Sequence, residues 1–246
     1  MKVGRMVQLW MLQVIVSNLI ILEASEALDP TQGFIHVALD SSNFKKCIIY
    51  EASEAADPTH GFIPVALDSS NFHVQKPYDV PVNQRYSFSN GVHKLCVYST
   101  DKPHTTDSPT LPRTEIRIAG HDYTSGVWQF EGYGYVPNGT SGVCIMQVFG
   151  ARHPHATTLQ LRVYDASLIS YMSPVLLQNM YDRWFRLNAI VDVAANNVKV
   201  YIDGVLKYTG GGRGQATHYF KFGVFTQNDP SHYMESRWKD IKLFRK

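Results

Sequence analysis

Three short segments of the sequence carry charged and amide side chains that together could hold a carboxylate. They are residues 113–117 (RTEIR), 147–149 (QVF) and 219–227 (YFKFGVFTQ). Alternate side chains of an extended strand share a face, so Arg113, Glu115 and Arg117 are expected to point to one side. Guanidinium, ammonium and amide groups donate hydrogen bonds to carboxylate oxygens, and these segments offer no obvious general acid or base. The expected chemistry is recognition of an anion.

The same alternation divides residues 219–227 into a polar and an apolar face. The polar face carries Tyr219, Lys221, Gly223, Phe225 and Gln227, and the apolar face carries Phe220, Phe222 and Val224. Gln147 and Phe149 share a face for the same reason. A ladder of charges on a solvated sheet would alternate in the same way, so spacing alone leaves both interpretations open.

The elements that must position these side chains are predicted to be short strands separated by turn residues. The predicted strands are residues 85–88, 93–98, 113–118, 127–136, 142–149, 158–164, 184–192, 198–202, 220–227 and 236–244. Such spacing indicates a β-sandwich or barrel. Asp203-Gly204 between two apolar runs predicts a hairpin, because a tight primed turn requires positive φ.

The three segments resemble the signature strands of the alginate lyase family, the jelly-roll polysaccharide lyases of family seven. The usual family forms are R-S/T-E-L/V-R, Q-I/V-H and YFKAGVYNQ. From about residue 57 to residue 246 the chain is more closely similar to the plant citrate-binding proteins of that superfamily, with phrases such as YDVPV, STDKPHTT and YMESRWKDIK. The resemblance implies an all-β fold, a jelly-roll antiparallel β-sandwich, over residues 51–246.

The resemblance also implies a mechanism, β-elimination from a uronate. In the family, arginine and glutamine neutralise the sugar carboxylate, histidine takes the proton and tyrosine protonates the leaving oxygen. Arg113 and Gln147 match the neutralising groups, whereas the histidine aligns with Phe149 and the tyrosine of GVYNQ with Phe225. A phenylalanine has no titratable proton, and each general acid or base typically contributes ~10²–10⁴ in rate. We therefore expect no catalytic residue in this chain.

Binding of citrate or a related polycarboxylate is the function that the resemblance favours. The expected ligand-binding residues are Arg113, Glu115, Arg117, Gln147, Tyr219, Lys221 and Gln227. Arg113 and Arg117 lie ~13 Å apart along a strand, so both cannot grip one carboxylate. Citrate is expected to use one arginine with Lys221 and Gln147, while Glu115 holds the other arginine and the two phenylalanines pack together.

Two alternatives stay open. The first is a polysaccharide lyase in which Tyr219, His121 or His218 takes over the proton transfers. The second is a wall protein that binds an oligouronate without cutting it.

Composition argues against several other classes of function. A net charge of +2 without a basic run predicts no attraction to nucleic acid or to a membrane surface. Cys47, Cys96 and Cys144 lack metal-site spacing, and His153-Pro-His155 is too short to bind a metal alone. Residues 210–214 (GGGRG) predict a flexible loop, a possible lid, and lack the context of a phosphate loop. No metal and no cofactor are expected.

The amino end has the pattern of a secretory signal peptide. Lys2 and Arg5 precede an apolar run that ends in small residues near Ala27, so residues 1–27 are expected to be removed. The run is too short and broken to predict a membrane span, and none is expected in the mature chain. Asn138-Gly-Thr140 is a glycosylation acceptor motif. These features favour the secretory pathway, with the vacuole or the cell wall as destination.

A tandem repeat follows this leader. Residues 23–44 recur as residues 51–72 with three differences. One pair of repeats is too few for a solenoid. The second copy runs directly into the family-like sequence, so residues 28–50, which hold most of the first copy, are expected to be surplus and loosely ordered.

Overall fold

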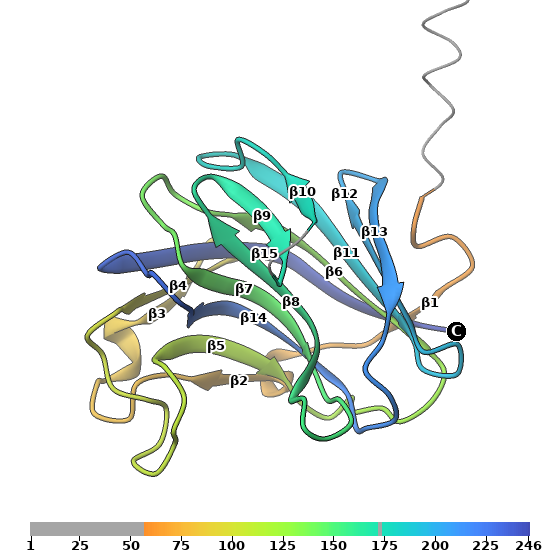
Figure 1. Ribbon diagram of the computed structural model, residues 1–246, viewed down its shortest axis with the longest axis horizontal. Coiled ribbons are helices and arrows are strands. Elements are labelled where there is room, and N and C mark those ends of the chain that lie inside the picture. The colour runs from red at the N-terminus through yellow and green to blue at the C-terminus, as the bar shows by residue number, and fades with distance from the viewer. Residues whose placement is uncertain (1–56, 172–173) are drawn as a thin grey trace, which may run out of the picture. The chain divides into compact units, whose positions relative to one another are not determined.

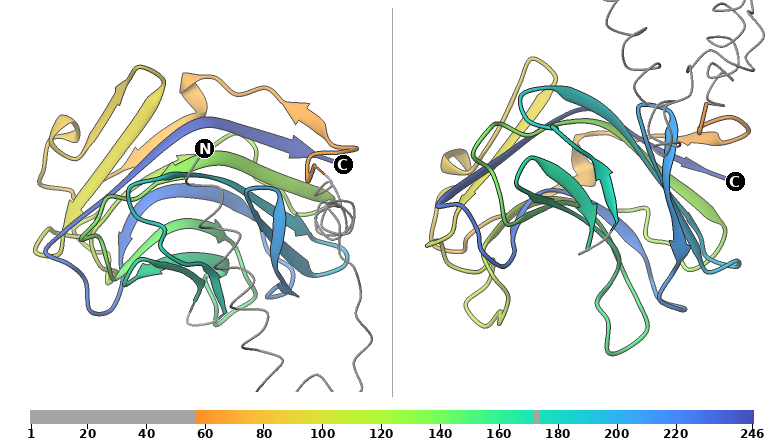
Figure 2. Two further views of the ribbon diagram at one scale, coloured as in Figure 1. Left: turned by 90° about the horizontal axis from the view of Figure 1, so that it is seen from above. Right: turned by 45° about the horizontal axis from the view of Figure 1, so that its top comes forward.

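Two antiparallel β-sheets form nearly all of the regular structure in the computed structural model, which describes residues 57–171 and 174–246 (Figure 1). One sheet has the strand order β13-β12-β11-β6-β15-β4-β3, with β1 paired to β15, and the other has the order β10-β9-β8-β7-β14-β5-β2. The two layers are seen edge on in Figure 2. The prediction of an all-β jelly-roll sandwich is confirmed.

The first sheet is built from β1 (Ile63–Val65), β3 (Tyr86–Ser89), β4 (Val92–Tyr98), β6 (Val127–Tyr135), β11 (Trp184–Asp192), β12 (Asn197–Ile202), β13 (Val205–Gly211) and β15 (Tyr233–Arg245). The second contains β2 (Phe72–Gln75), β5 (Arg113–Ile118), β7 (Val143–Phe149), β8 (Thr157–Tyr164), β9 (Ser167–Ser170), β10 (Val175–Leu177) and β14 (Tyr219–Thr226). Two short 3₁₀ helices, η2 (Ser69–Asn71) and η3 (Val82–Gln84), lie between strands.

All ten predicted strands are present, with ends shifted by a few residues. The hairpin turn is also confirmed, because Asp203 and Gly204 have φ values of 52° and 80°. The prediction of a loop at residues 210–214 is partly wrong, since β13 extends to Gly211. The strands β1, β2, β9 and β10, of three or four residues each, were not predicted, and β13 was expected only as the second arm of the hairpin.

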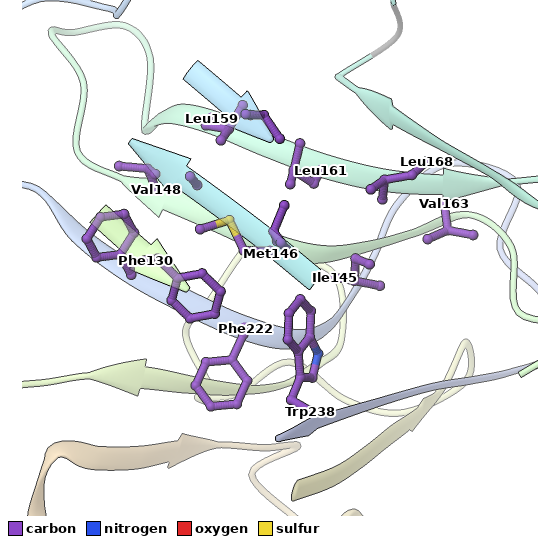
Figure 3. Close-up of a cluster of buried hydrophobic side chains, with 14 of the residues drawn as sticks. Phe130, Ile145, Met146, Val148, Leu159, Leu161, Val163, Leu168, Phe222 and Trp238 are labelled. Atoms are coloured by element: carbon purple, nitrogen blue, oxygen red, sulfur yellow. The ribbon is translucent and has the colours of Figure 1, made fainter. Parts of the chain in front are cut away.

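The apolar faces of the two sheets meet in one core (Figure 3). Phe220, Phe222 and Val224 of β14 are almost fully buried there, against Phe130 and Trp238 of the first sheet. Burying a large apolar side chain contributes roughly 1.5–3 kcal/mol. This burial determines which face of β14 is turned to the core. The residues that alternate with Phe220, Phe222 and Val224 must therefore project from the opposite face of the second sheet.

Gly223 produces a β-bulge in the middle of β14. Its φ is 139°, and a Cβ there would lie 2.4 Å from the carbonyl oxygen of Thr114. The pairing of β14 with β7 shifts register between Phe222 and Phe225 at this point. As a result Lys221 lies opposite Gln147, and Phe225 lies opposite Cys144.

The predicted signal peptide (residues 1–27) and surplus segment (residues 28–50) lie outside the described residues. The described part of the repeat belongs to the second copy, which supplies β1, η2 and the first residue of β2. Strand β1 pairs with residues 243–245 near the C-terminus, and β2 pairs with β5.

Candidate functional site

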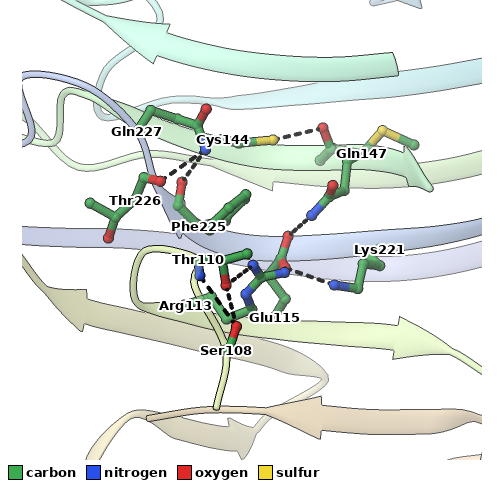
Figure 4. Close-up of polar contacts among 11 residues, drawn as sticks. Ser108, Thr110, Arg113, Glu115, Cys144, Gln147, Lys221, Phe225, Thr226 and Gln227 are labelled. Atoms are coloured by element: carbon green, nitrogen blue, oxygen red, sulfur yellow. Dashed lines mark hydrogen bonds and ion pairs between the residues drawn. The ribbon is translucent and has the colours of Figure 1, made fainter. Parts of the chain in front are cut away.

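Glu115 is the centre of a polar cluster on the outward face of the second sheet (Figure 4). Its Oε2 accepts hydrogen bonds from Lys221 Nζ at 3.0 Å and from Arg113 Nη1 at 3.3 Å. Its Oε1 accepts one from Gln147 Nε2 at 2.5 Å. The donors come from β5, β14 and β7, three adjacent strands. The structure thus brings together four of the predicted site residues.

This cluster is buried yet charged. Glu115 is 0% exposed and Lys221 only 2%. Burial alone would raise the pKa of Glu115, but Lys221 and Arg113, with the Gln147 amide, bring it below its usual value. Burial also lowers the pKa of Lys221, against the opposing effect of Glu115. With two cations and one carboxylate, the cluster has one positive charge in excess.

The structure differs from the expectation in which side chains Glu115 binds. We expected Glu115 to hold one arginine and to leave Lys221 and Gln147 free for citrate. Glu115 instead binds Arg113, Lys221 and Gln147 at once. The positive charge of Arg113 and Lys221 still acts on an anion at the surface. Few N–H groups of Arg113, Lys221 and Gln147 are left free to donate to that anion.

Arg117 is the more accessible arginine of the pair. Its Nη2 contacts Asp122 Oδ2 at 2.5 Å, and a third of each side chain is exposed. Its guanidinium carbon lies 4.0 Å from the centre of the Tyr219 ring, a cation–π geometry. Tyr219 in turn stacks on Phe149 with 4.8 Å between ring centres. Arg117, Tyr219 and Phe149 therefore form one partly exposed surface beside the buried cluster.

Phe149 and Phe225 do not pack together as expected. Phe149 stacks on Tyr219, whereas Arg113 lies over the Phe225 ring at 3.9 Å. Phe225 follows Tyr219 by six positions, or roughly 20 Å along the strand. The hydroxyl beside position 149 is that of Tyr219.

Three other predicted side chains lie outside the cluster around Glu115. Gln227 turns its amide to the backbone carbonyls of Phe225 and Thr226. His218 is 2% exposed and lies on the core side of β14 against Tyr123. His121 lies in the loop after β5, partly exposed.

The loop before β5 adds residues that the sequence did not reveal. Thr110 Oγ1 accepts a hydrogen bond from Arg113 Nη2 at 2.8 Å and also contacts Ser108 Oγ at 2.8 Å (Figure 4). Burial, then Arg113 and Lys221, lower the pKa of His104. Its Nδ1 is buried without a hydrogen-bond partner among the described residues. His104 lies in the polar phrase STDKPHTT, and Ser108 and Thr110 follow it closely, but nothing in this stretch of sequence indicated contact with β5.

The remaining predicted features are placed as follows. Cys96 and Cys144 are buried free thiols, and Cys47 lies outside the described residues. Asn138 is exposed in the turn between β6 and β7. Within residues 57–171 and 174–246, the histidine, cysteine and acidic side chains form no group that could hold a metal ion. No helix in this part of the chain is long and apolar enough to cross a membrane.

The model of the family described as alginate lyase matches residues 66–245. The chain belongs to the alginate lyase family. Among individual proteins, it is 55% identical over 218 residues to the citrate-binding protein of Hevea brasiliensis, covering 88% of this chain and 79% of the relative.

Solved structures agree with the family at the level of the fold. The alginate lyase AlgAT5 of polysaccharide lyase family 7 superposes with a TM-score of 0.57 at 16% identity, covering 72% of this chain and 94% of the other. Alginate lyase A1-II′ superposes with a TM-score of 0.58 at 13% identity, covering 72% and 95%. At these identities the similarity concerns the fold alone.

Proposed function

We propose that this protein binds citrate or a related polycarboxylate without chemical conversion, at the polar face centred on Glu115. The observation that carries the proposal is the excess positive charge of the buried cluster, formed by Arg113, Lys221 and Glu115. A buried cation without a counter-charge attracts an anion strongly, because the protein interior screens charge poorly. The identity of 55% to a relative named citrate-binding protein supports citrate as the acid.

The side chains at positions 149, 218 and 219 support binding over catalysis. Proton abstraction requires a group that is deprotonated at working pH and within hydrogen-bonding reach of the substrate. Position 149 is a phenylalanine, and His218 faces the core. Burial raises the pKa of Tyr219, with Arg117 opposing it, so the phenol stays protonated. Tyr219 can donate a proton to a ligand but is a poor base.

Titration calorimetry with citrate tests the binding. We expect wild-type protein to bind citrate, and Arg113→Gln and Arg117→Gln to weaken binding about 10- to 100-fold, the worth of one hydrogen bond to a charged group. Arg183→Gln is the matched control, since Arg183 is an exposed arginine paired with Asp203 on the other sheet. Citrate binding that survives both site variants unchanged would place the anion elsewhere. If Arg113→Gln fails to fold, the citrate affinity of Arg117→Gln alone tests whether citrate binds at this site.

The same samples distinguish the two alternatives. Growth of unsaturated-product absorbance on an oligouronate would identify a lyase and would be expected to disappear with Tyr219→Phe. Affinity that rises with oligouronate length, without absorbance, would favour a polyuronate-binding wall protein. Tight binding of citrate alone supports the small-acid function.

We also infer that the protein enters the secretory pathway, for the vacuole or the cell wall. The support is the leader-like sequence of residues 1–27 and the exposed position of Asn138. Expression in plant cells should give a chain that starts near residue 28, with a glycan that Asn138→Gln removes. A chain that keeps residues 1–27 and lacks the glycan would contradict this inference.

A further inference from the structure

A second group of arginines lies on the same sheet face as Arg117, around Tyr171. The guanidinium carbon of Arg213 is 4.0 Å from the centre of the Tyr171 ring, and that of Arg162 is 5.4 Å from it. Arg162 is part of β8, whereas Arg213 comes from the glycine-rich segment after β13. Two distant parts of the chain thus place cations on one aromatic ring.

The two groups are linked by a row of neighbouring side chains across the sheet. Tyr219 is paired with Phe149 in the β14–β7 ladder, and Phe149 with Thr157 in the β7–β8 ladder. The Tyr171 hydroxyl contacts Thr157 Oγ1 at 2.9 Å. The row begins with Arg117 over Tyr219 and ends with Arg213 over Tyr171. Each end of an aromatic surface therefore carries an arginine.

Arg213 has no acidic partner in the described part of the chain. No carboxylate of residues 57–171 or 174–246 forms an ion pair with Arg152 or Arg213. The neighbours of Arg213 are His155, with Nδ1 at 3.5 Å from Nη1, and the backbone N–H of Arg152, which donates to the Arg213 carbonyl. A guanidinium stacked on a ring keeps its in-plane N–H groups available for a carboxylate.

Tyr171 is held in an unusual backbone conformation. Its φ is 54°, which is rare for a bulky residue and costs roughly 1–3 kcal/mol. The hydroxyl donates to the Thr157 carbonyl at 2.8 Å, and the Tyr171 N–H donates to the Gln160 carbonyl at 2.9 Å. These bonds fix the ring under Arg213. Strain of this kind is concentrated at ligand sites.

We propose that Arg213 and Tyr171 form a second carboxylate-binding site, distinct from the site at Glu115 and Arg117. The choice of a carboxylate rests on the proposed function, whereas the site itself rests on the arrangement of Arg213, Tyr171 and Thr157. Tyr219 and Thr157 are two strands apart, or about 10 Å. One citrate ion has too short a carbon chain to bridge the two arginines. The second carboxylate comes either from a second small acid or from the far end of a longer polycarboxylate.

Calorimetry of the full chain with citrate and with short and long oligogalacturonates tests the site. With a second small acid, wild-type protein takes up two citrate ions, and Arg213→Gln takes up one with its Kd changed less than twofold. With a longer ligand, one oligomer binds per chain, and Arg213→Gln weakens the long oligomer about tenfold and the short one little. Tyr171→Leu, which removes the ring under Arg213, should act in the same direction, whereas Arg183→Gln should change nothing.

The outcomes separate this proposal from the proposed function. Unchanged stoichiometry and affinity for every ligand in Arg213→Gln would overturn the second site, even if Arg117→Gln abolishes citrate binding. Binding lost in Arg213→Gln but kept in Arg113→Gln and Arg117→Gln would support the second site and overturn the first. If neither citrate nor an oligogalacturonate binds wild-type protein, both proposals fail.

Discussion

Glu115 carries a charge with no exposed surface because three side chains donate to its two oxygens. Arg113, Lys221 and Gln147 replace the water that the carboxylate loses on folding. The arrangement has a second effect, since each donor is also held in place by the carboxylate. At the residue scale, Glu115 is an organiser of the site, although its own charge opposes an anionic ligand.

Replacing Glu115 by glutamine should therefore destabilise the protein. The change leaves the buried charges of Arg113 and Lys221 without a counter-ion, and breaking such a pair typically costs about 3–5 kcal/mol. Urea unfolding measures the loss. Asp122→Asn is the control, because its ion pair with Arg117 is one-third exposed and should contribute less than about 1 kcal/mol. Equal, small losses in both variants would show that Glu115 is not held as described.

Alternation predicted which side chains of β5 and β14 share the polar face, because burial of Phe220 and Phe222 forces the other set outward. It could not predict that Gln147 bonds to Glu115, since that contact depends on the strand order β7-β14-β5. Thr110 and His104 were missed for a related reason. They lie in the loop before β5, and the alternation of residues along a strand does not predict the conformation of a loop.

Strand β14 is the element on which both faces depend. It pairs with β5 and β7, contributes Phe222 to the core and Lys221 to the site, and is bent at Gly223. The β14–β7 register places Phe149 opposite Tyr219, six positions before Phe225, and the bulge shifts that register by one residue. The three signature segments show which residue types the site contains. The distances between those residues depend on the register of β14 with β5 and β7, which the sequence alone does not predict.

Gly223→Ala tests the role of the bulge. A Cβ at this position would lie 2.4 Å from a backbone oxygen and on a residue with φ of 139°, so we expect a loss of several kcal/mol and weaker citrate binding. Gly211→Ala is the matched control, since nothing lies within 4 Å of its added Cβ. Thermal unfolding of both variants checks the prediction, which fails if Gly223→Ala unfolds like wild type.

The whole molecule is expected to be less stable in acid, and a buried histidine is one cause. Burial lowers the pKa of His93 to about 4, beside the rings of Phe72, Phe88 and Phe222. The unfolded chain takes up the proton near pH 6.5 and the folded chain does not, so stability falls as pH drops from about 6.5 towards 4.

His93→Gln should flatten this part of the profile. We expect the wild-type free energy of unfolding to fall by on the order of 2 kcal/mol more than that of the variant between pH 7 and pH 4. His60→Gln, at an exposed position, is the control. Urea unfolding at several pH values gives the two slopes. Parallel profiles for wild type and His93→Gln would exclude His93 as the titrating group.

Because of the unbalanced positive charge under the polar face, the thermal stability of the protein reports the binding of an anion. An anion that neutralises this charge binds the folded chain and not the unfolded one, so ligand at a hundred times its Kd adds about 2.7 kcal/mol to the free energy of unfolding. A panel of unlabelled organic acids and acidic sugars can therefore be ranked by melting temperature alone. Such a ranking needs no prior choice of ligand and would read out the chemistry that the buried lysine and arginine select.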